Sequence, residues 1–169
     1  MALYIGEKRV SELECKDYTL DSYSFSDLYL STLEFMEENF RGAAIVTGRI
    51  EEPGYLTVSV YGLAHFIKRL LSIVFGDCVL KIHAKGTKFS FSLELSFERS
   101  TQLSKEEKDE LEKIAELSGF KATLNEFDGG GSYLLVFNIL HSSEAPIYAK
   151  NTRNIRAALE KSFFYIPFE

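Results

Sequence analysis

Apolar and polar residues alternate most regularly in the middle of the chain. From Lys88 to Phe97 the two kinds of residue alternate one by one, which is the pattern of a β-strand with one buried and one exposed face. Between Tyr61 and Gly76 the apolar residues instead recur at intervals of three and four, the pattern of a helix that lies on a core. Strict alternation is typical of antiparallel sheets with one wet face, so we expect helices on one face of the sheet only.

Similar patterns recur on both sides of this stretch. We expect further strands at Ala43–Glu51, Leu56–Val60, Cys78–Lys85, Phe120–Phe127 and Ser132–Leu140. We expect further helices at Ser26–Phe40, Ser104–Ser118 and Thr152–Phe163. The turn Glu52-Pro53-Gly54 predicts a hairpin between the first two of these strands. This order of elements predicts an α/β (α+β) sandwich of two layers with a mixed, mostly antiparallel sheet.

Two of the helices carry specific signals at their ends. Ser26 is predicted to be the N-cap of the first helix. Ser104 and Glu107 form a capping box for a later helix, and Gly119 predicts its end. The charged run Lys105–Lys113 is expected to be a solvated helix face. The inner face of the first helix is expected to hold Tyr29, Leu33, Met36 and Phe40.

The two ends of the chain show weaker patterns. Residues 1–23 are predicted to form a short strand or an N-terminal arm followed by a loop, with Tyr4, Tyr18 and Tyr23 at the surface; packing of these tyrosines on a neighbour is the alternative. Residues 141–169 add the last helix and an apolar tail, which either packs back on the sheet or contacts another chain. No linker divides the chain, so we expect one domain over residues 1–169 with its core at 26–140.

Composition argues against several classes of function. Hydrophobic residues make up 46% and charged residues 26% of the 169 residues, which is ordinary globular composition. The net charge of −6 argues against nucleic acid and anionic membranes as main partners. We expect no membrane span and no signal peptide, hence a cytoplasmic protein. Cys15 and Cys78 lie far apart and are expected to be reduced thiols.

Few residues are candidates for catalytic chemistry. The three histidines, His65, His83 and His141, are each expected to be at the surface or partly satisfied by neighbours, not catalytic or phosphorylated. No group of residues has the spacing of a metal site or of a nucleophile elbow. We therefore expect no catalytic residue and no metal.

The order of elements and the local sequences resemble the ATP-binding catalytic domain of sensor histidine kinases, in the GHKL superfamily of histidine kinase-like ATPases. The resemblance covers roughly Ser26–Leu140 and rests on order and spacing. Leu63–Phe75 is similar to the helix that bears the family's asparagine box, and Gly130-Gly131-Ser132-Tyr133 to the turn before its last strand. The resemblance implies a histidine kinase-like ATPase fold.

The resemblance also implies a site, and there the sequence departs from the family. Family domains hold ATP through Mg²⁺, which needs oxygen ligands, and asparagines on the inner helix supply them. Arg69 and Ile73 stand at those positions. No glycine occurs between Gly86 and Gly119, so the family's Asp-x-Gly-x-Gly loop and its later glycine box are not matched, and the lid is reduced to a few residues. The altered nucleotide cleft that this alignment implies contains Arg69, Ser72, Ile73, Ser96 and Arg99.

These departures lead to three hypotheses of function. The first is a non-catalytic, degenerate domain that acts as a binding or regulatory module in signalling, with a protein partner or a second copy of itself and no cofactor. The alternative is a nucleotide-binding protein or kinase-related enzyme in which Arg69, and also Arg99, meets phosphate without Mg²⁺. Exposure of Arg69 to solvent, or pairing with Asp77 or Glu94, is the simpler account of that arginine. The third hypothesis, phosphotransfer to response regulators, needs a histidine on a dimer-forming helix, and Ser26–Phe40 has none.

Overall fold

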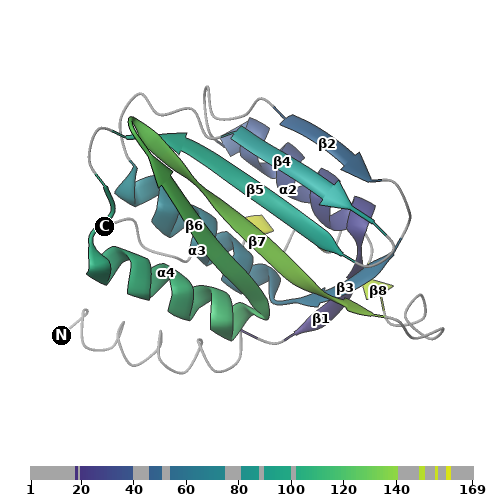
Figure 1. Ribbon diagram of the computed structural model, residues 1–169. Coiled ribbons are helices and arrows are strands. Elements are labelled where there is room, and N and C mark those ends of the chain that lie inside the picture. The colour runs from purple at the N-terminus through teal and green to yellow at the C-terminus, as the bar shows by residue number, and fades with distance from the viewer. Residues whose placement is uncertain are drawn as a thin grey trace.

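A computed structural model describes residues 18, 20–39, 46–50, 54–74, 81–87, 90–99, 102–140, 149–150, 155 and 159–160. Within these residues the chain forms two layers, a twisted sheet and a set of helices that lie behind it in Figure 1. The strands are β1 (Asp21–Ser24), β2 (Val46–Ile50), β3 (Tyr55–Val58), β4 (Lys81–Gly86), β5 (Phe91–Glu98), β6 (Phe120–Phe127), β7 (Gly130–Leu140) and β8 (Ala149–Lys150). The helices are α2 (Phe25–Asn39), α3 (Val60–Ile73) and α4 (Lys105–Ser118). The predicted two-layer α+β architecture is confirmed.

The long strand β7 is the centre of the sheet. Along one edge it pairs with β5, and along the other it pairs first with β6 and then with β3. The strand order among the described residues is β2-β4-β5-β7-β3-β1-β8, with β6 beside β7. The β2–β4 and β1–β8 pairs are parallel and the others are antiparallel, so the prediction of a mixed, mostly antiparallel sheet is confirmed.

The predicted hairpin between the strands at Ala43–Glu51 and Leu56–Val60 is wrong. β2 pairs in parallel with β4 at one end of the sheet, whereas β3 lies between β7 and β1. The reason is that β1, from the segment predicted to be an arm, occupies the second edge of β3. The N–H of Phe25 also donates to the carbonyl of Gly54 at 2.9 Å, which fixes the start of α2 beside β3.

Aromatic rings fill the space between the two layers. Phe66, on the inner face of α3, meets Phe120 of β6 and Tyr133 of β7 edge-on, with ring centroids 5.5 and 5.3 Å apart. Burial of one such side chain is worth about 1.5–3 kcal/mol. The helical stripe predicted for this segment is confirmed by the buried residues Leu63, Phe66, Ile67, Leu70 and Val74.

The first helix is rotated relative to the prediction. Its N-cap is Ser24, whose hydroxyl accepts a hydrogen bond from the Asp27 N–H at 3.1 Å, and not Ser26, which is exposed. Phe25 enters the core and stacks on Phe91, with centroids 4.7 Å apart, and this contact sets the phase of the helix. Tyr29 and Leu33 are only half-buried, while Met36 and Phe40 lie outside the residues whose side chains are described. The buried face holds Phe25, Leu28, Ser31, Thr32 and Phe35.

α4 packs against α3 and carries the residues of most interest for function. It starts at the capping box of Ser104 and Glu107 and ends at Gly119, which adopts the left-handed conformation with φ of 85°, so both end signals are confirmed. Near its end, the Ser118 carbonyl accepts a hydrogen bond from the Ser59 N–H at 2.9 Å. Of the described helices, none has both the length and the apolar character needed to span a membrane.

Both ends of the described chain join this framework. Tyr23, expected at the surface, is buried in the core at 5% exposure. β8 pairs with β1, and Ile155 and Leu159, which lie within the last predicted helix, are fully buried. The remainder of Thr152–Phe163, and the aromatic tail after it, fall outside the described residues.

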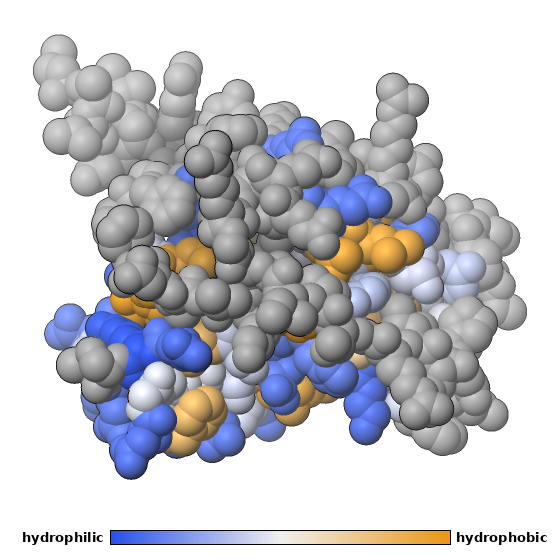
Figure 2. All heavy atoms as spheres, turned by 90° about the horizontal axis from the view of Figure 1, so that it is seen from above, coloured by the Kyte–Doolittle hydropathy of each residue, from blue (hydrophilic) through white to orange (hydrophobic). Residues whose placement is uncertain are grey.

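Some large apolar side chains of the described residues are exposed. On the face drawn in Figure 2, the described residues show small apolar patches between hydrophilic ones. Single exposed apolar side chains are normal for globular proteins. Within the described ranges, the exposed large apolar residues are Leu20, Leu30, Leu117, Phe127, Leu134 and Val136.

Candidate functional site

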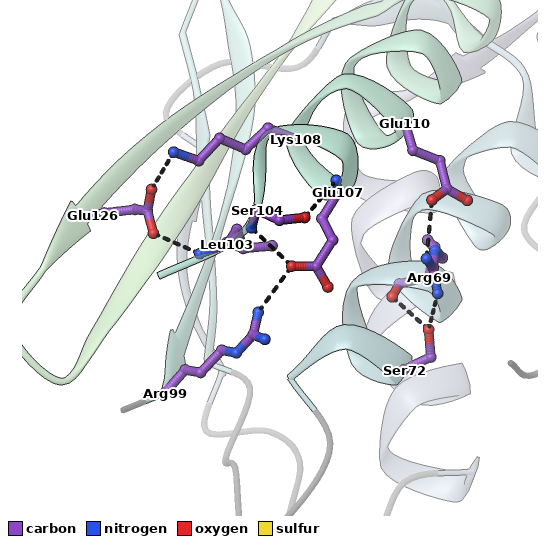
Figure 3. A network of polar contacts seen from close by, with 9 residues as sticks. All are labelled: Arg69, Ser72, Arg99, Leu103, Ser104, Glu107, Lys108, Glu110 and Glu126. Atoms are coloured by element: carbon purple, nitrogen blue, oxygen red, sulfur yellow. Dashed lines mark hydrogen bonds and ion pairs between the residues drawn. The ribbon is translucent and has the colours of Figure 1, made fainter. Parts of the chain in front are cut away.

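A network of charged side chains connects α4 to α3, to the end of β5 and to the end of β6. Figure 3 shows the contacts that α4 makes: Glu110 is directed to Arg69 of α3, Glu107 to Arg99 and Lys108 to Glu126. The network includes Arg69 and Arg99, the two arginines of the expected cleft. It consists of Arg69, Ser72, Arg99, Leu103, Ser104, Glu107, Lys108, Glu110 and Glu126.

Arg69 joins α3 to α4. One terminal nitrogen lies 3.0 Å from the carboxylate of Glu110, and the other donates to the hydroxyl of Ser72 at 3.2 Å. The Ser72 hydroxyl in turn donates to the Arg69 carbonyl at 2.8 Å, one turn back along the helix. The described ion-pair partner of Arg69 is therefore Glu110 and not Glu94, and the expected pairing with Asp77 falls outside the described residues.

Arg99 fixes the start of the β5–α4 connection. Its N–H donates to the carbonyl of Gly129 in the β6–β7 turn at 2.9 Å, and its guanidinium lies 3.5 Å from Glu107. Burial alone would raise the pKa of the Glu107 carboxyl, but the hydrogen bonds from Ser104 and the charge of Arg99 hold this pKa below its usual value.

Glu126 fixes the end of the same connection. Its carboxylate accepts a hydrogen bond from the Leu103 N–H at 3.0 Å and lies 2.7 Å from the ammonium of Lys108. The bond to Lys108, followed by that from Leu103, holds the pKa of Glu126 below its usual value. The side chain of Leu103 is buried at 4% exposure. The segment that the resemblance equates with a lid is thus tied to the sheet at both of its described ends.

Not all of the residues expected in the cleft come together. Arg69 and Ser72 are bonded to each other, and Arg99 is linked to them only through α4, where Glu107 and Glu110 lie one turn apart. Ile73 is half-buried against the core. Ser96 lies on the opposite face of the sheet from the helices, since it alternates with the buried residues of β5.

The two described histidines, His65 and His83, are not among the residues of this network. His83 is exposed on β4, as expected. His65 is half-buried and bonded to Tyr18, and His141 falls outside the described residues. Among the described residues, no three side chains of His, Cys, Asp or Glu are grouped to hold a metal ion.

The network offers two guanidinium groups, each already paired with a carboxylate. Nε of Arg69 is buried and has no hydrogen-bond acceptor among the residues described, whereas the buried Nη1 of Arg99 faces the carboxylate of Glu107 at 3.5 Å. Such an arrangement can hold α4 in place, and it can bind an anion only in competition with the glutamates.

Comparisons with known proteins address the fold. No protein-family model and no curated protein matches the sequence. Among solved structures, one similar structure is that of the histidine kinase ThkA in complex with the response regulator protein TrrA. The alignment covers 82% of this chain and 48% of the matched chain, with 14% sequence identity and a TM-score of 0.56. A second similar structure is the nucleotide-free catalytic domain of ThkA. The alignment covers 71% of this chain and 96% of that domain's chain, with 9% sequence identity and a TM-score of 0.52.

The chain has the histidine kinase-like ATPase fold. The resemblance seen in the sequence is therefore confirmed at the level of the fold. At these identities the likeness extends no further, and the chain spans about half the length of the ThkA chain in the complex.

Sequence reasoning missed most of the partners in the network. The run Lys105–Lys113 was expected to be a solvated face, yet Glu107, Lys108 and Glu110 all make contacts to other elements. The available signal was the capping box, which places Glu107 at the start of α4 beside the end of β5. Glu126 carried no comparable local signal.

Proposed function

We propose that this chain is a non-catalytic, histidine kinase-like domain that acts as a binding or regulatory module in signalling, by contact with a protein partner and without binding Mg-ATP. The observation that carries the proposal is the ion pair between Arg69 of α3 and Glu110 of α4.

The chemistry of the donor set supports this proposal. Mg²⁺ requires oxygen ligands and keeps several waters, and the resemblance assigns its ligands to the positions of Arg69 and Ile73. A guanidinium repels the cation and an isoleucine offers no donor atom. The carboxylate of Glu110 is an oxygen donor, but it is neutralised by Arg69 at 3.0 Å. We infer that these residues do not fit a Mg-ATP site.

The fixed connection between β5 and α4 supports it further. A segment that closes over a nucleotide must be able to move. Here Arg99 is bonded to the β6–β7 turn and Leu103 to Glu126. Two anchors a few residues apart favour a structural role for this segment.

A protein partner is part of the proposal because the fold occurs in such a setting. ThkA is described in complex with a response regulator protein. From this complex we take only the proposal that the partner of this chain is also a signalling protein.

Titration calorimetry tests the proposal. Mg-ATP and Mg-ADP, each titrated to about 1 mM into the whole chain, are expected to give no saturable heat. Binding in the micromolar range to either nucleotide would overturn the proposal.

A second function is favoured by the buried Nε of Arg69, which lacks a hydrogen-bond acceptor among the described residues. An arginine suits phosphate because its planar fork donates two parallel hydrogen bonds. In this alternative a nucleotide phosphate displaces Glu110 without Mg²⁺. A thermal-shift screen of nucleotides in EDTA is then expected to show stabilisation that Arg69→Ala abolishes and that Lys113→Ala, an exposed control on α4, leaves unchanged. No shift with any nucleotide would rule this alternative out.

A further inference from the structure

The neighbouring strands β6, β7, β5 and β4 share a face that is turned away from the helices. Figure 1 looks onto this face, with the helices behind it. Its residues alternate along the strands with buried residues such as Leu95 and Leu135. We call it the outer face, and it consists of Lys121, Thr123 and Asn125 on β6, Ser132, Leu134 and Val136 on β7, Ser92, Glu94 and Ser96 on β5, and His83 and Lys85 on β4.

Two aliphatic side chains stand in the middle of the outer face. Leu134 and Val136 lie two residues apart on β7, with exposed fractions of 38% and 37%. The solvent side of an antiparallel sheet is normally polar, and all other residues of the outer face are polar or charged. Covering the two aliphatic groups with another surface would remove apolar area from water, which is favourable. The middle of the outer face therefore has the character of a contact surface.

Glu94 and Lys121 flank the aliphatic pair on opposite sides of β7. Glu94, on β5, is the cross-strand partner of Leu134. Lys121, on β6, is the cross-strand partner of Val136. The line from Glu94 to Lys121 therefore crosses β7 at Leu135, midway between the two aliphatic residues. Within the described ranges neither of the two charged side chains forms an ion pair, so both charges are available to another molecule.

This arrangement of charges is complementary to itself. Consider two outer faces related by a two-fold axis that lies between them, passes over Leu135 and runs at right angles to the Glu94–Lys121 line. Glu94 of each copy then meets Lys121 of the other copy. The same axis brings Leu134 and Val136 of both copies together at the centre. From the spacing of strands and residues, the strands of the two copies cross at roughly 70°, which is closer to orthogonal than to aligned sheet packing.

We propose that the outer face binds a second copy of this chain, with Leu134 and Val136 at the centre of a two-fold contact and two Glu94–Lys121 ion pairs beside them. An apolar centre with a polar rim is the usual anatomy of a protein interface. The contact spans roughly 20 Å by 20 Å on each copy, which is smaller than a standard interface, so the dimer is weak, with a Kd on the order of 100 µM. The inference goes beyond the proposed function, because it concerns a different surface from the nucleotide cleft and holds whether or not Mg-ATP binds.

Sedimentation equilibrium of the whole chain, from about 10 µM to about 1 mM, tests whether the dimer forms. The variant Leu134→Ser removes an aliphatic group from the centre and is expected to raise Kd at least about fivefold. The matched control is Leu117→Ser, which removes an exposed leucine from α4 and is expected to keep Kd within about twofold of wild type. A chain that stays monomeric at the highest concentration, or an equal effect of the two variants, would overturn the proposal.

Charge reversal distinguishes this dimer from other modes of association. Glu94→Lys and Lys121→Glu each place like charges opposite one another in both ion pairs, so each is expected to raise Kd at least about tenfold. The double variant reverses both pairs and is expected to return Kd to within about threefold of wild type. General repulsion between copies predicts something else: the net charge of −6 becomes less negative in the first variant and more negative in the second, so Kd would change in opposite directions.

The control for net charge is Glu116→Lys on the exposed face of α4, which changes the charge of the chain by the same amount as Glu94→Lys. It is expected not to weaken the dimer. Opposite effects of the two single variants, or a double variant as weak as either of them, would overturn the proposal.

NMR of the wild-type chain locates the contact without any substitution. On dilution from about 1 mM to about 50 µM, the methyl signals of Leu134 and Val136 are expected to shift, while those of Leu117 on α4 stay constant. This measurement decides the matter even where a variant fails to fold. Methyl signals of Leu134 and Val136 that do not depend on concentration, or a dimer that shifts only signals elsewhere, would overturn the proposal.

Discussion

At one end of the α3–α4 pair Gly62 lies directly against Ser118, whereas at the other end Arg69 and Glu110 form an ion pair. The two contacts are seven and eight residues apart on their helices, which is about two turns or roughly 10 Å. The first is buried and made by small groups that leave no room. The second is partly open to solvent, with side-chain exposures of 22% and 45%.

This difference indicates which end of the helix pair can open. Close packing of buried atoms cannot be loosened without loss of dispersion contacts. An exposed ion pair exchanges its partner for water at little cost, since such pairs contribute about 0–1 kcal/mol. The Arg69–Glu110 end of the helix pair, which the resemblance links to nucleotide binding, is therefore held more weakly than the Gly62–Ser118 end, although an ion pair connects the two helices there.

The largest effect is expected from Gly62→Ala. The new methyl group would collide with Ser118, whose hydroxyl is itself bonded to the Ile114 carbonyl, so the helices must separate. We expect a loss of about 1–3 kcal/mol in the free energy of unfolding, measured by urea denaturation. Glu116→Ala, on the exposed face of α4, serves as the control. A stability within about 0.3 kcal/mol of wild type would show that this end is not tightly packed.

A smaller effect is expected from Glu126→Gln, which weakens the anchor of the β5–α4 connection. The hydrogen bonds to Lys108 and Leu103 lose the carboxylate charge, so we expect a loss of about 1 kcal/mol at pH 7. Because the folded pKa of Glu126 is lowered, its contribution is present above the unfolded value of 4.5 and is lost as the pH falls through the folded pKa. Urea unfolding at pH 7 and pH 3.5 should show a smaller pH dependence in the variant. The control Glu112→Gln should keep the dependence of the wild type; equal dependence in all three proteins would contradict the role of Glu126.

The smallest effect is expected at the Arg69–Glu110 pair itself. A double-mutant cycle with Arg69→Ala and Glu110→Ala is expected to give a coupling free energy of about 0.2–1 kcal/mol. Most of this should disappear in 1 M salt, where charges are screened within about 3 Å. A coupling free energy above about 2 kcal/mol would contradict this expectation. It would show that the Arg69–Glu110 end of the helix pair is held at least as strongly as the Gly62–Ser118 end.

The features that could be predicted from the sequence are those with local causes. Strict alternation located β5, and the capping box and Gly119 located both ends of α4, because each pattern is complete within a few residues. The pairing of β2 with β4 joins residues 36 positions apart, such as Val46 and Ile82, and nothing in either strand specifies its neighbour. The local turn signal was therefore a poor guide to the sheet.

The sequence allowed us to predict which nucleotide-binding residues the candidate site lacks. It did not allow us to predict the side-chain contacts of the site. The alignment placed Arg69 and Ile73 at positions where a metal site needs oxygen. It could not show that Arg69 meets Glu110, 41 residues later, because this contact arises only when α3 packs on α4, or that Tyr18 reaches His65, because this contact arises only when Tyr18 packs on α3. Side-chain partners across a helix interface are determined by tertiary packing.

The burial of Ile155 and Leu159 has a consequence for anyone who trims this protein. A shortened version that stops at Leu140, where the resemblance in the sequence ends, would lose both aliphatic side chains and the strand beside β1. Removal of one large aliphatic group from an interior typically costs about 2–5 kcal/mol, which is comparable to the whole stability of many small proteins. We therefore expect the smallest stable unit to extend beyond the part whose sequence resembles the kinase domain.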